Sequence, residues 1–247
     1  SLNFDEYAYY SQTKKKFPKY SFLITFDDGF FNNFKIAAPI LEKYNTKAIF
    51  YLTTNWIDKN YMAWTNRIDY AVKKSRGGEI KIGNKKLSFT NKLKSKINFS
   101  LEMRNIVKND LNINSEKFAD KVQKKLLNKT IKKSNLNIYK KMSWSNINKL
   151  LRNKLFSIGG HSHNHETLTK LSERQLNKEI KLSLSYIKKK CNQNVVHYSY
   201  PDGHKLSFNS KVIKILKKNK IISCPTALHG VNSVGDNLFK LKRVFVK

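Results

Sequence analysis

The sequence predicts an α/β fold because short apolar runs alternate with amphipathic segments along most of its 247 residues. The first such unit runs from "KYSFLITF" at 19–26 through "IAAPILEKYN" at 36–45 to "KAIFYLTT" at 47–54. The outer two segments suit buried strands, and Pro39 stands near the start of the helix between them. A strand, helix and strand of this length imply parallel pairing.

Residues 60–141 are predicted to be an inserted, mainly helical cap within a single domain, 1–247. The segment begins with a hairpin pattern that turns at Gly83–Asn84, and Lys-rich helical segments follow. Ser115 is the expected N-cap of one of these helices. The region holds no residues that suggest chemistry of its own.

The α/β pattern resumes after the insertion. A helix is expected with Ser143 or Ser145 as its cap, then a strand at 155–160, then a helix opened by a capping box of Ser172 and Gln175. Three more apolar runs and one more helix are expected at 195–203, 210–219, 220–224 and 239–246. The whole pattern therefore indicates one parallel α/β domain.

The charge is extreme, with 49 Lys+Arg against 17 Asp+Glu and a formal net charge of +32. Such a charge attracts anionic polymers and anionic lipid surfaces. The lysines are scattered and accompanied by many Asn and Ile, which is typical of a residue-usage bias. They lack the interleaved Arg and aromatic residues of a stacking surface, so no specific nucleic acid is predicted.

The compartment is left open by the sequence. No apolar run approaches the roughly 18 residues of a transmembrane segment. The first residues lack the order of a signal peptide, but the chain starts with Ser. Bacterial cytoplasm, including a membrane surface, and the cell envelope after removal of a signal are both compatible. Cys191 and Cys224 are expected to be buried thiols, with one bridge between them as the alternative.

Three polar clusters follow predicted strands: Asp27-Asp28-Gly29, the segment 161–165 with three of the six histidines, and Tyr200-Pro201-Asp202-Gly203. In a parallel α/β domain, the C-terminal ends of the strands share one face, where ligands bind. We therefore expect the three clusters to meet.

The first two clusters together predict a metal site. His161 and His165 would project to one side of a helical turn, whereas an extended segment would put both of them and His163 on one face. Adjacent aspartates repel unless a cation or a proton compensates them. One could bind a cation while the other takes a proton from a water molecule. Either cluster alone is more often an ordinary turn or solvated loop; both together favour a metal.

These residues resemble a known family. "TFDDG", "HSHNH" and "YSYPDG" are similar to the first three motifs of the polysaccharide deacetylases, the NodB-homology domain of carbohydrate esterase family 4. The resemblance extends over most of 20–58 and 142–247 and omits the middle region. It implies an irregular (β/α) barrel of about seven strands.

The resemblance also implies roles for the motif residues. Asp28, His161 and His165 would bind one divalent ion, Zn²⁺ in first place and Co²⁺, Ni²⁺ or Mn²⁺ as alternatives. Asp27 would be the general base. His163 falls at a variable motif position.

The third motif, Tyr200-Pro201-Asp202-Gly203, would border the substrate, with the Asp202 N–H facing the oxyanion. It departs from the family at Ser199, where many members carry an Arg that steadies the base. Its form is similar to that of exopolysaccharide deacetylases acting on β-1,6-linked N-acetylglucosamine. No fourth motif is clear, and the fifth motif, which supplies the general acid, is missing. His229 and His197 are the remaining candidates for the acid.

The expected function is removal of N-acetyl groups from amino sugars of a bacterial surface polysaccharide, an exopolysaccharide or a lipid-linked precursor. One alternative is a small-molecule amidase or imidase on the same fold. Another is a polysaccharide-binding protein with a degenerate site, which the missing Arg and His would favour.

Overall fold

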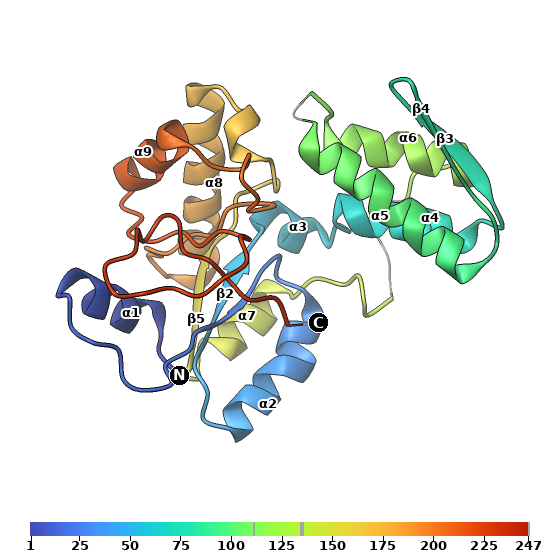
Figure 1. Cartoon of the computed structure of the whole chain (residues 1–247). Coiled ribbons are helices and arrows are strands. Elements are labelled where there is room, and N and C mark those ends of the chain that lie inside the picture. Colours follow the sequence, from blue (N-terminus) through green and yellow to red (C-terminus); the bar gives the residue numbers. More distant parts are fainter. Residues whose placement is uncertain (111, 134–135, 247) are drawn as a thin grey trace. The chain divides into compact units, whose positions relative to one another are not determined.

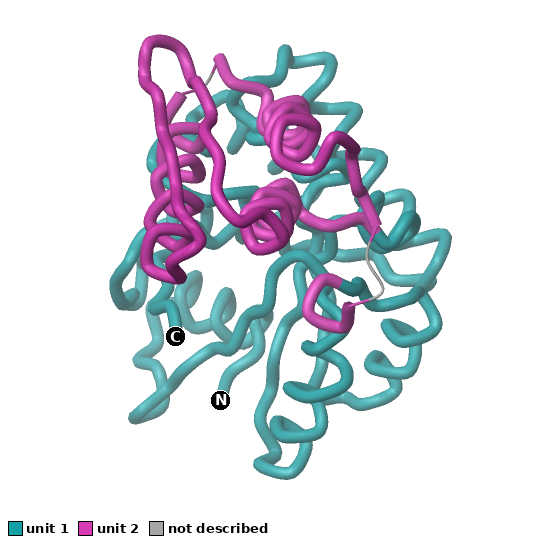
Figure 2. The backbone as a smooth tube through the Cα atoms, turned by 90° about the vertical axis from the view of Figure 1, so that its right-hand side faces the viewer, with its two compact units in different colours: residues 1–60, 140–247 teal, residues 61–139 magenta. Residues whose placement is uncertain are grey.

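The computed structural model describes residues 1–110, 112–133 and 136–246. It divides into two compact units, one formed by Ser1–Asn60 with Lys140–Lys247 and the other by Tyr61–Tyr139 (Figure 2). The predicted α/β class is confirmed, with both helices and parallel strands in the first unit. The second unit falls inside the segment interpreted as an insertion, and its action as a cap stays a prediction.

The first unit contains a small parallel sheet and the helices around it (Figure 1). Its elements are α1 (Phe4–Gln12), β1 (Ile24–Phe26), the π-helix η1 (Asn33–Ala37), α2 (Ala38–Lys43), β2 (Ala48–Leu52), α3 (Thr54–Lys59), α7 (Trp144–Leu150), β5 (Phe156–Gly160), the 3-10 helix η2 (Leu168–Lys170), α8 (Glu173–Cys191) and α9 (Ser210–Lys218). The strands follow the order β1-β2-β5, with both pairs parallel.

The register of this sheet aligns the strand ends that lead into the polar clusters. Phe26, the last residue of β1, pairs with Phe50, and Leu52 at the end of β2 pairs with Gly160 at the end of β5. All five residues of β2 are buried, because this central strand is covered on both faces. The segments that follow β1 and β5 therefore emerge on the same edge of the sheet.

The pairing continues beyond β5 as single parallel bridges. Gly160 pairs with Tyr198, His197 with Ser223, and His229 with Arg243. The segments expected as strands at 195–203, 220–224 and 239–246 form no regular ladder among the described residues. These bridges and single backbone hydrogen bonds, such as that from the Ile222 N–H to the Val196 carbonyl, hold them side by side. Prolines at positions 201 and 225 lack the N–H that a regular ladder needs, which limits its extent. Lys247, which ends the closing segment, lies outside the described residues.

Side-chain caps fix where the helices begin, and two of the three predicted caps are found. Ser143 caps α7, and Ser172 with Gln175 forms the capping box of α8. Ser115 is not a cap, because the Asn114 side chain accepts the hydrogen bond from the Lys117 N–H. Asn is as good an N-cap as Ser, so Ser115 becomes the first residue of α6.

Helix α1 was not predicted from the sequence. It begins with a capping box between Asn3 and Glu6 and packs Phe4 and Tyr7 against the sheet. Phe4 also contacts the ring of His197. The two cysteines are free thiols, and burial raises the pKa of each.

The second unit has a core of its own. Its elements are α4 (Trp64–Lys74), β3 (Gly78–Ile82), β4 (Lys85–Phe89), α5 (Leu93–Asn109) and α6 (Ser115–Leu127). The antiparallel pair β3–β4 turns at Gly83–Asn84, as predicted. Arg67 is buried and forms ion pairs with Glu116 and Asp120, which compensates its charge. No helix among the described residues combines the length and the apolar character needed to cross a bilayer.

The turn at Gly203 brings two backbone segments into close approach. Gly203 has a φ of 64°, and its carbonyl accepts a hydrogen bond from the Ala227 N–H at 2.7 Å. A Cβ at this position would lie 2.6 Å from the Ala227 nitrogen. Only glycine therefore fits both the left-handed backbone and the space.

We predict that Gly203→Ala destabilises the protein more than Gly235→Ala does. Both glycines have a positive φ, but a Cβ on Gly235 would meet no atom within 4 Å. The control therefore measures the backbone cost alone, about 1 to 2 kcal/mol, and the clash with Ala227 should add about 1 to 3 kcal/mol. Urea denaturation of both variants measures the difference. Equal loss of stability would show that the close approach at Gly203 relaxes at no cost.

Candidate functional site

Asp28, His161 and His165 form the centre of the candidate site. The Asp28 Oδ1 atom lies 3.4 Å from His161 Nε2 and 3.3 Å from His165 Nε2. One ligand atom from each of the three side chains lies within 4.8 Å of the others. Asp28 follows β1 and the imidazoles follow β5, so the parallel register brings the three together.

The backbone at two of these residues is left-handed. Asp28 has a φ of 72° and His165 a φ of 59°. Non-glycine residues pay of order 1 to 3 kcal/mol for such conformations, which persist where the surrounding structure imposes them and which cluster at functional sites. Gly29 continues the turn with a φ of 70°.

The segment 161–165 adopts neither of the two geometries expected from its spacing. It is a loop that turns at Ser162, whose φ is 63° and whose hydroxyl accepts a hydrogen bond from the His165 N–H. His163 points out of the cluster, and its Nδ1 lies 2.8 Å from the Thr54 hydroxyl. The buried Glu179 of α8 accepts hydrogen bonds from the backbone and side chain of Asn164, which holds the loop in place.

The donor set fits a divalent metal ion. Ligand atoms about 2.1 Å from a tetrahedral ion lie about 3.4 Å apart, close to the spacing around Asp28. The buried Asp28 Oδ1 has no hydrogen-bond partner among the described residues. The His161 Nδ1 lies 2.8 Å from the Ser199 carbonyl, so it carries the proton and leaves Nε2 free to ligate.

Charges shift the pKa values of these three side chains in different directions. Burial by itself would raise the pKa of Asp28, but the two imidazoles and Lys141 lower it well below its usual range. Burial lowers the pKa of His165. The pKa of His161 is raised, because the charges of Asp27 and Asp28 exceed the effect of its burial. Asp28 is therefore ionised at neutral pH, as a metal ligand must be.

Asp27 is paired with a residue from the other end of the chain. Arg243 donates from its two terminal nitrogens to Oδ1 and Oδ2 of Asp27, at 3.0 and 2.9 Å. Burial by itself would raise the pKa of Asp27, but the charge and hydrogen bonds of Arg243 hold it below its usual value. The bidentate geometry also fixes the plane of the carboxylate.

Arg243 is the main residue that the sequence analysis did not identify. The missing Arg was sought at Ser199, and the structure places the Ser199 hydroxyl 3.3 Å from the Arg243 guanidinium. Backbone hydrogen bonds from the Thr226 N–H to the Leu241 carbonyl and from the Arg243 N–H to the Leu228 carbonyl hold the closing segment beside residues 226–228 and so position this side chain. The sequence signal that could have identified Arg243 is the arginine in "LKRVFVK". This segment resembles the family's closing strand.

The third cluster lies next to the first two. The pKa of His165 responds to the charge of Asp202, and the Asp202 carboxylate accepts a hydrogen bond from Thr167 in the loop after β5. The Tyr200 hydroxyl donates to the Phe239 carbonyl, and this side chain and Pro201 are buried. These two residues therefore support the turn from within the core.

His197 and His229 are the two candidates for the general acid. Among the described residues, no contact joins either of them to the metal-site cluster. The buried His197 uses both ring nitrogens elsewhere, with Nδ1 at 2.7 Å from Ser223 Oγ and Nε2 at 3.0 Å from Asp5. It thereby ties α1 to the sheet. His229 is exposed, and its backbone pairs with Arg243.

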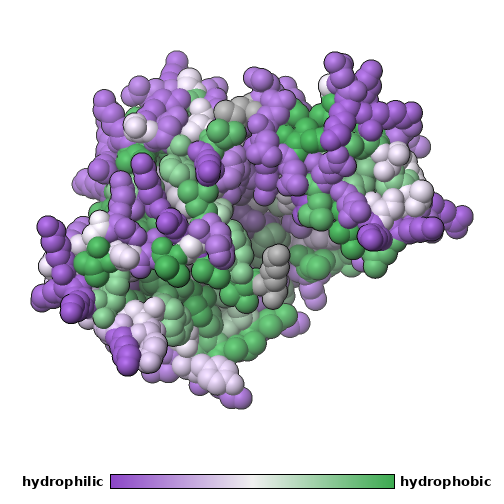
Figure 3. All heavy atoms as spheres, viewed as in Figure 1, coloured by the Kyte–Doolittle hydropathy of each residue, from purple (hydrophilic) through white to green (hydrophobic). Residues whose placement is uncertain are grey.

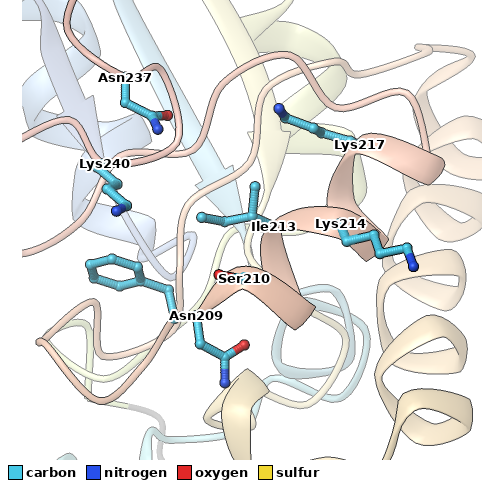
Figure 4. A pocket seen from close by; sticks show the side chains of 8 residues that line it. Asn209, Ser210, Ile213, Lys214, Lys217, Asn237 and Lys240 are labelled. Atoms are coloured by element: carbon cyan, nitrogen blue, oxygen red, sulfur yellow. The ribbon is translucent and has the colours of Figure 1, made fainter.

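A separate hollow of about 560 Å³ lies beside α9 (Figure 4). Lys214, Lys217 and Lys240 are among the described residues that line it, and none of the metal-site residues is. Hydrophilic residues cover much of the visible surface of both units (Figure 3). The hollow is therefore separate from the metal-site cluster.

Comparisons with known proteins agree with the geometry. A polysaccharide deacetylase family model matches residues 14–222. No curated protein sequence matches the chain.

Solved structures with a similar fold include three deacetylases. The deacetylase PplD of Streptococcus pyogenes, in complex with acetate, is 17% identical, with a TM-score of 0.62 over 98% of this chain and 72% of that one. The BpsB deacetylase domain of Bordetella bronchiseptica is 14% identical, with a TM-score of 0.59 over 95% and 75%. A de-N-acetylase of Aggregatibacter actinomycetemcomitans is 15% identical, with a TM-score of 0.57 over 97% and 75%.

These likenesses show the fold, and the family model spans well over half of the chain. The chain therefore belongs to the polysaccharide deacetylase family, and it is a deacetylase of the class that its three motifs indicated.

Proposed function

We propose that the protein is a metal-dependent N-deacetylase acting on amino sugars of a bacterial surface polysaccharide, an exopolysaccharide or its lipid-linked precursor. The observation that carries this proposal is the convergence of Asp28, His161 and His165 beside an ionised, tethered Asp27. Two nitrogens and one oxygen suit Zn²⁺, with Co²⁺, Ni²⁺ or Mn²⁺ as alternatives. The net charge of +32 would draw the protein to anionic polymers or membrane surfaces.

A divalent ion held by Asp28 and the two imidazoles would polarise the amide carbonyl and make a water molecule a stronger nucleophile. Asp27 accepts the proton of the attacking water, because its carboxylate is ionised and fixed by Arg243. The Asp202 N–H donates to the oxyanion that forms at the former carbonyl. When the C–N bond breaks, acetate is released and the amine nitrogen takes up the proton that Asp27 received from the water. Both ring nitrogens of His197 are engaged by Ser223 and Asp5, which argues against His197 as the acid.

Arg243 also bears on the alternative of a degenerate binding protein. That alternative drew support from the missing Arg of the third motif. A bidentate guanidinium on Asp27 supplies the same steadying charge from another part of the chain.

An acetate-release assay on a panel of N-acetylated oligosaccharides, lipid-linked sugars and small amides tests the proposal. Release from the small amides alone would favour an amidase, and release from none would favour a binding protein.

We predict that the purified protein binds one divalent ion and that Asp28→Ala and His165→Ala abolish binding. Each change removes one of three ligands, and the remaining two hold an ion weakly. His163→Ala is the matched control, because this histidine of the same loop faces Thr54 instead. Metal content by mass spectrometry measures the result. One ion per chain in Asp28→Ala would contradict the ligand assignment.

A second prediction separates the base from the ligands. Asp27→Asn should keep the metal ion and lose deacetylation by about a hundredfold or more, since only the proton acceptor is removed. Acetate release and metal content are measured on the same sample. Wild-type activity in this variant would exclude Asp27 as the base.

A third prediction concerns pH. Arg243 lowers the pKa of Asp27, so activity that requires the ionised base is present above that pKa and is lost as the pH falls through it. In Arg243→Gln the pKa rises, and kcat/KM should begin to fall at a higher pH than in the wild type. Arg174→Gln, an exposed change of the same charge, is the control. An unchanged acidic limb in Arg243→Gln would show that Asp27 is not the titrating group.

A further inference from the structure

Lys141 is a buried cation that the mechanism does not use. Its side chain lies beside two aromatic rings, with Nζ 3.3 Å from the ring centroid of Phe30 and 4.7 Å from that of Trp56. Nζ is buried and has no hydrogen-bond partner among the described residues. Burying an ammonium without such partners is costly, so a nearby negative charge is needed to compensate it.

That negative charge belongs to the metal site. Burial lowers the pKa of Lys141 to about 8, and Asp28 is the charge that opposes this shift. In turn, Lys141 contributes to the lowered pKa values of Asp28 and His165. The ammonium therefore acts on two of the three candidate ligands through space.

The surrounding contacts hold Lys141 in this position. Its backbone pairs with Phe30, and its N–H donates to the Asn60 side chain at 2.9 Å. Trp56 stacks on the His165 ring, with the centroids 4.5 Å apart and 16° between the planes. A continuous stack thus runs from the ammonium through Trp56 to a metal ligand.

The burial of Nζ decides between two roles for this side chain. A lysine that bound an oxygen of the substrate would present its N–H groups to the open site, and this Nζ is enclosed by protein atoms. The ammonium therefore acts through its electric field on the groups around it. The same field opposes any cation that Asp28 binds.

We propose, building on the proposed function, that Lys141 is a positioning residue of the metal site: its fixed charge compensates Asp28 in the metal-free protein and lowers the affinity of the site for a divalent ion. Without a metal ion, the cation spares Asp28 from being an uncompensated buried charge. When a metal ion is bound, the ion and the Lys141 ammonium are two positive charges that both act on the Asp28 carboxylate. The site therefore holds its ion less tightly than the three ligands alone would.

The test measures the affinity for Zn²⁺ alone, by competition with a chelating dye at pH 7 and fixed ionic strength. Lys141→Met keeps an unbranched apolar stem and removes the charge, so we expect the Kd for Zn²⁺ to fall at least tenfold. Lys140→Met is the matched control, because Lys140 is exposed and its Nζ lies over the Phe31 ring at 4.8 Å. The control removes the same charge from the chain and should leave the Kd unchanged.

Tighter binding is a result that structural damage does not produce, since a disordered ligand set binds more weakly. An unchanged or higher Kd in Lys141→Met would overturn the inference while leaving the ligand assignment intact. A wild-type protein that binds no Zn²⁺ would overturn the proposed function instead. Lys141→Gln is interpreted in the same way if the Met variant does not fold, and Lys141→Arg should restore the wild-type Kd because it keeps the charge.

Discussion

The structure of the site depends on how the chain separates two negative charges on successive residues. Asp27 turns toward the Arg243 guanidinium, and Asp28 turns toward two imidazoles. Asp28 itself has a left-handed backbone, with a φ of 72°. Each carboxylate thus has partners of its own, and each stays ionised for a different role.

The parallel sheet supplies these partners from distant parts of the sequence. Asp27 and Asp28 follow β1, the histidines follow β5, and the bridges beyond β5 add the segments of Ser199 and Arg243. The Ser199 carbonyl orients His161 while the Ser199 hydroxyl contacts the guanidinium, so one residue supports both halves of the site. Strained turns are tolerated because the pairing on either side leaves the loops few alternatives.

The sequence predicted what is local and missed what depends on which segments become neighbours. Asp28, His161 and His165 were expected to meet because each follows a strand and each is a metal-ligand type. Arg243 was not foreseen, because its partnership with Asp27 follows from the order of the segments beyond β5. Lys141 was hidden among 49 Lys+Arg residues, and only its burial distinguishes it from the exposed lysines. Caps were predictable except where Asn114 competed successfully with Ser115.

The charge balance around the site connects these observations. Arg243 compensates Asp27, and the charge of Lys141 acts on Asp28, so these two carboxylates and two cations together carry no net charge. A divalent ion entering such a site would keep most of its charge uncompensated. Two unpaired carboxylates would bind the ion more strongly, but they would also neutralise the field that polarises an amide carbonyl. A site for hydrolysis therefore gains when its carboxylates bind the ion less strongly. The buried ammonium of Lys141 weakens that binding.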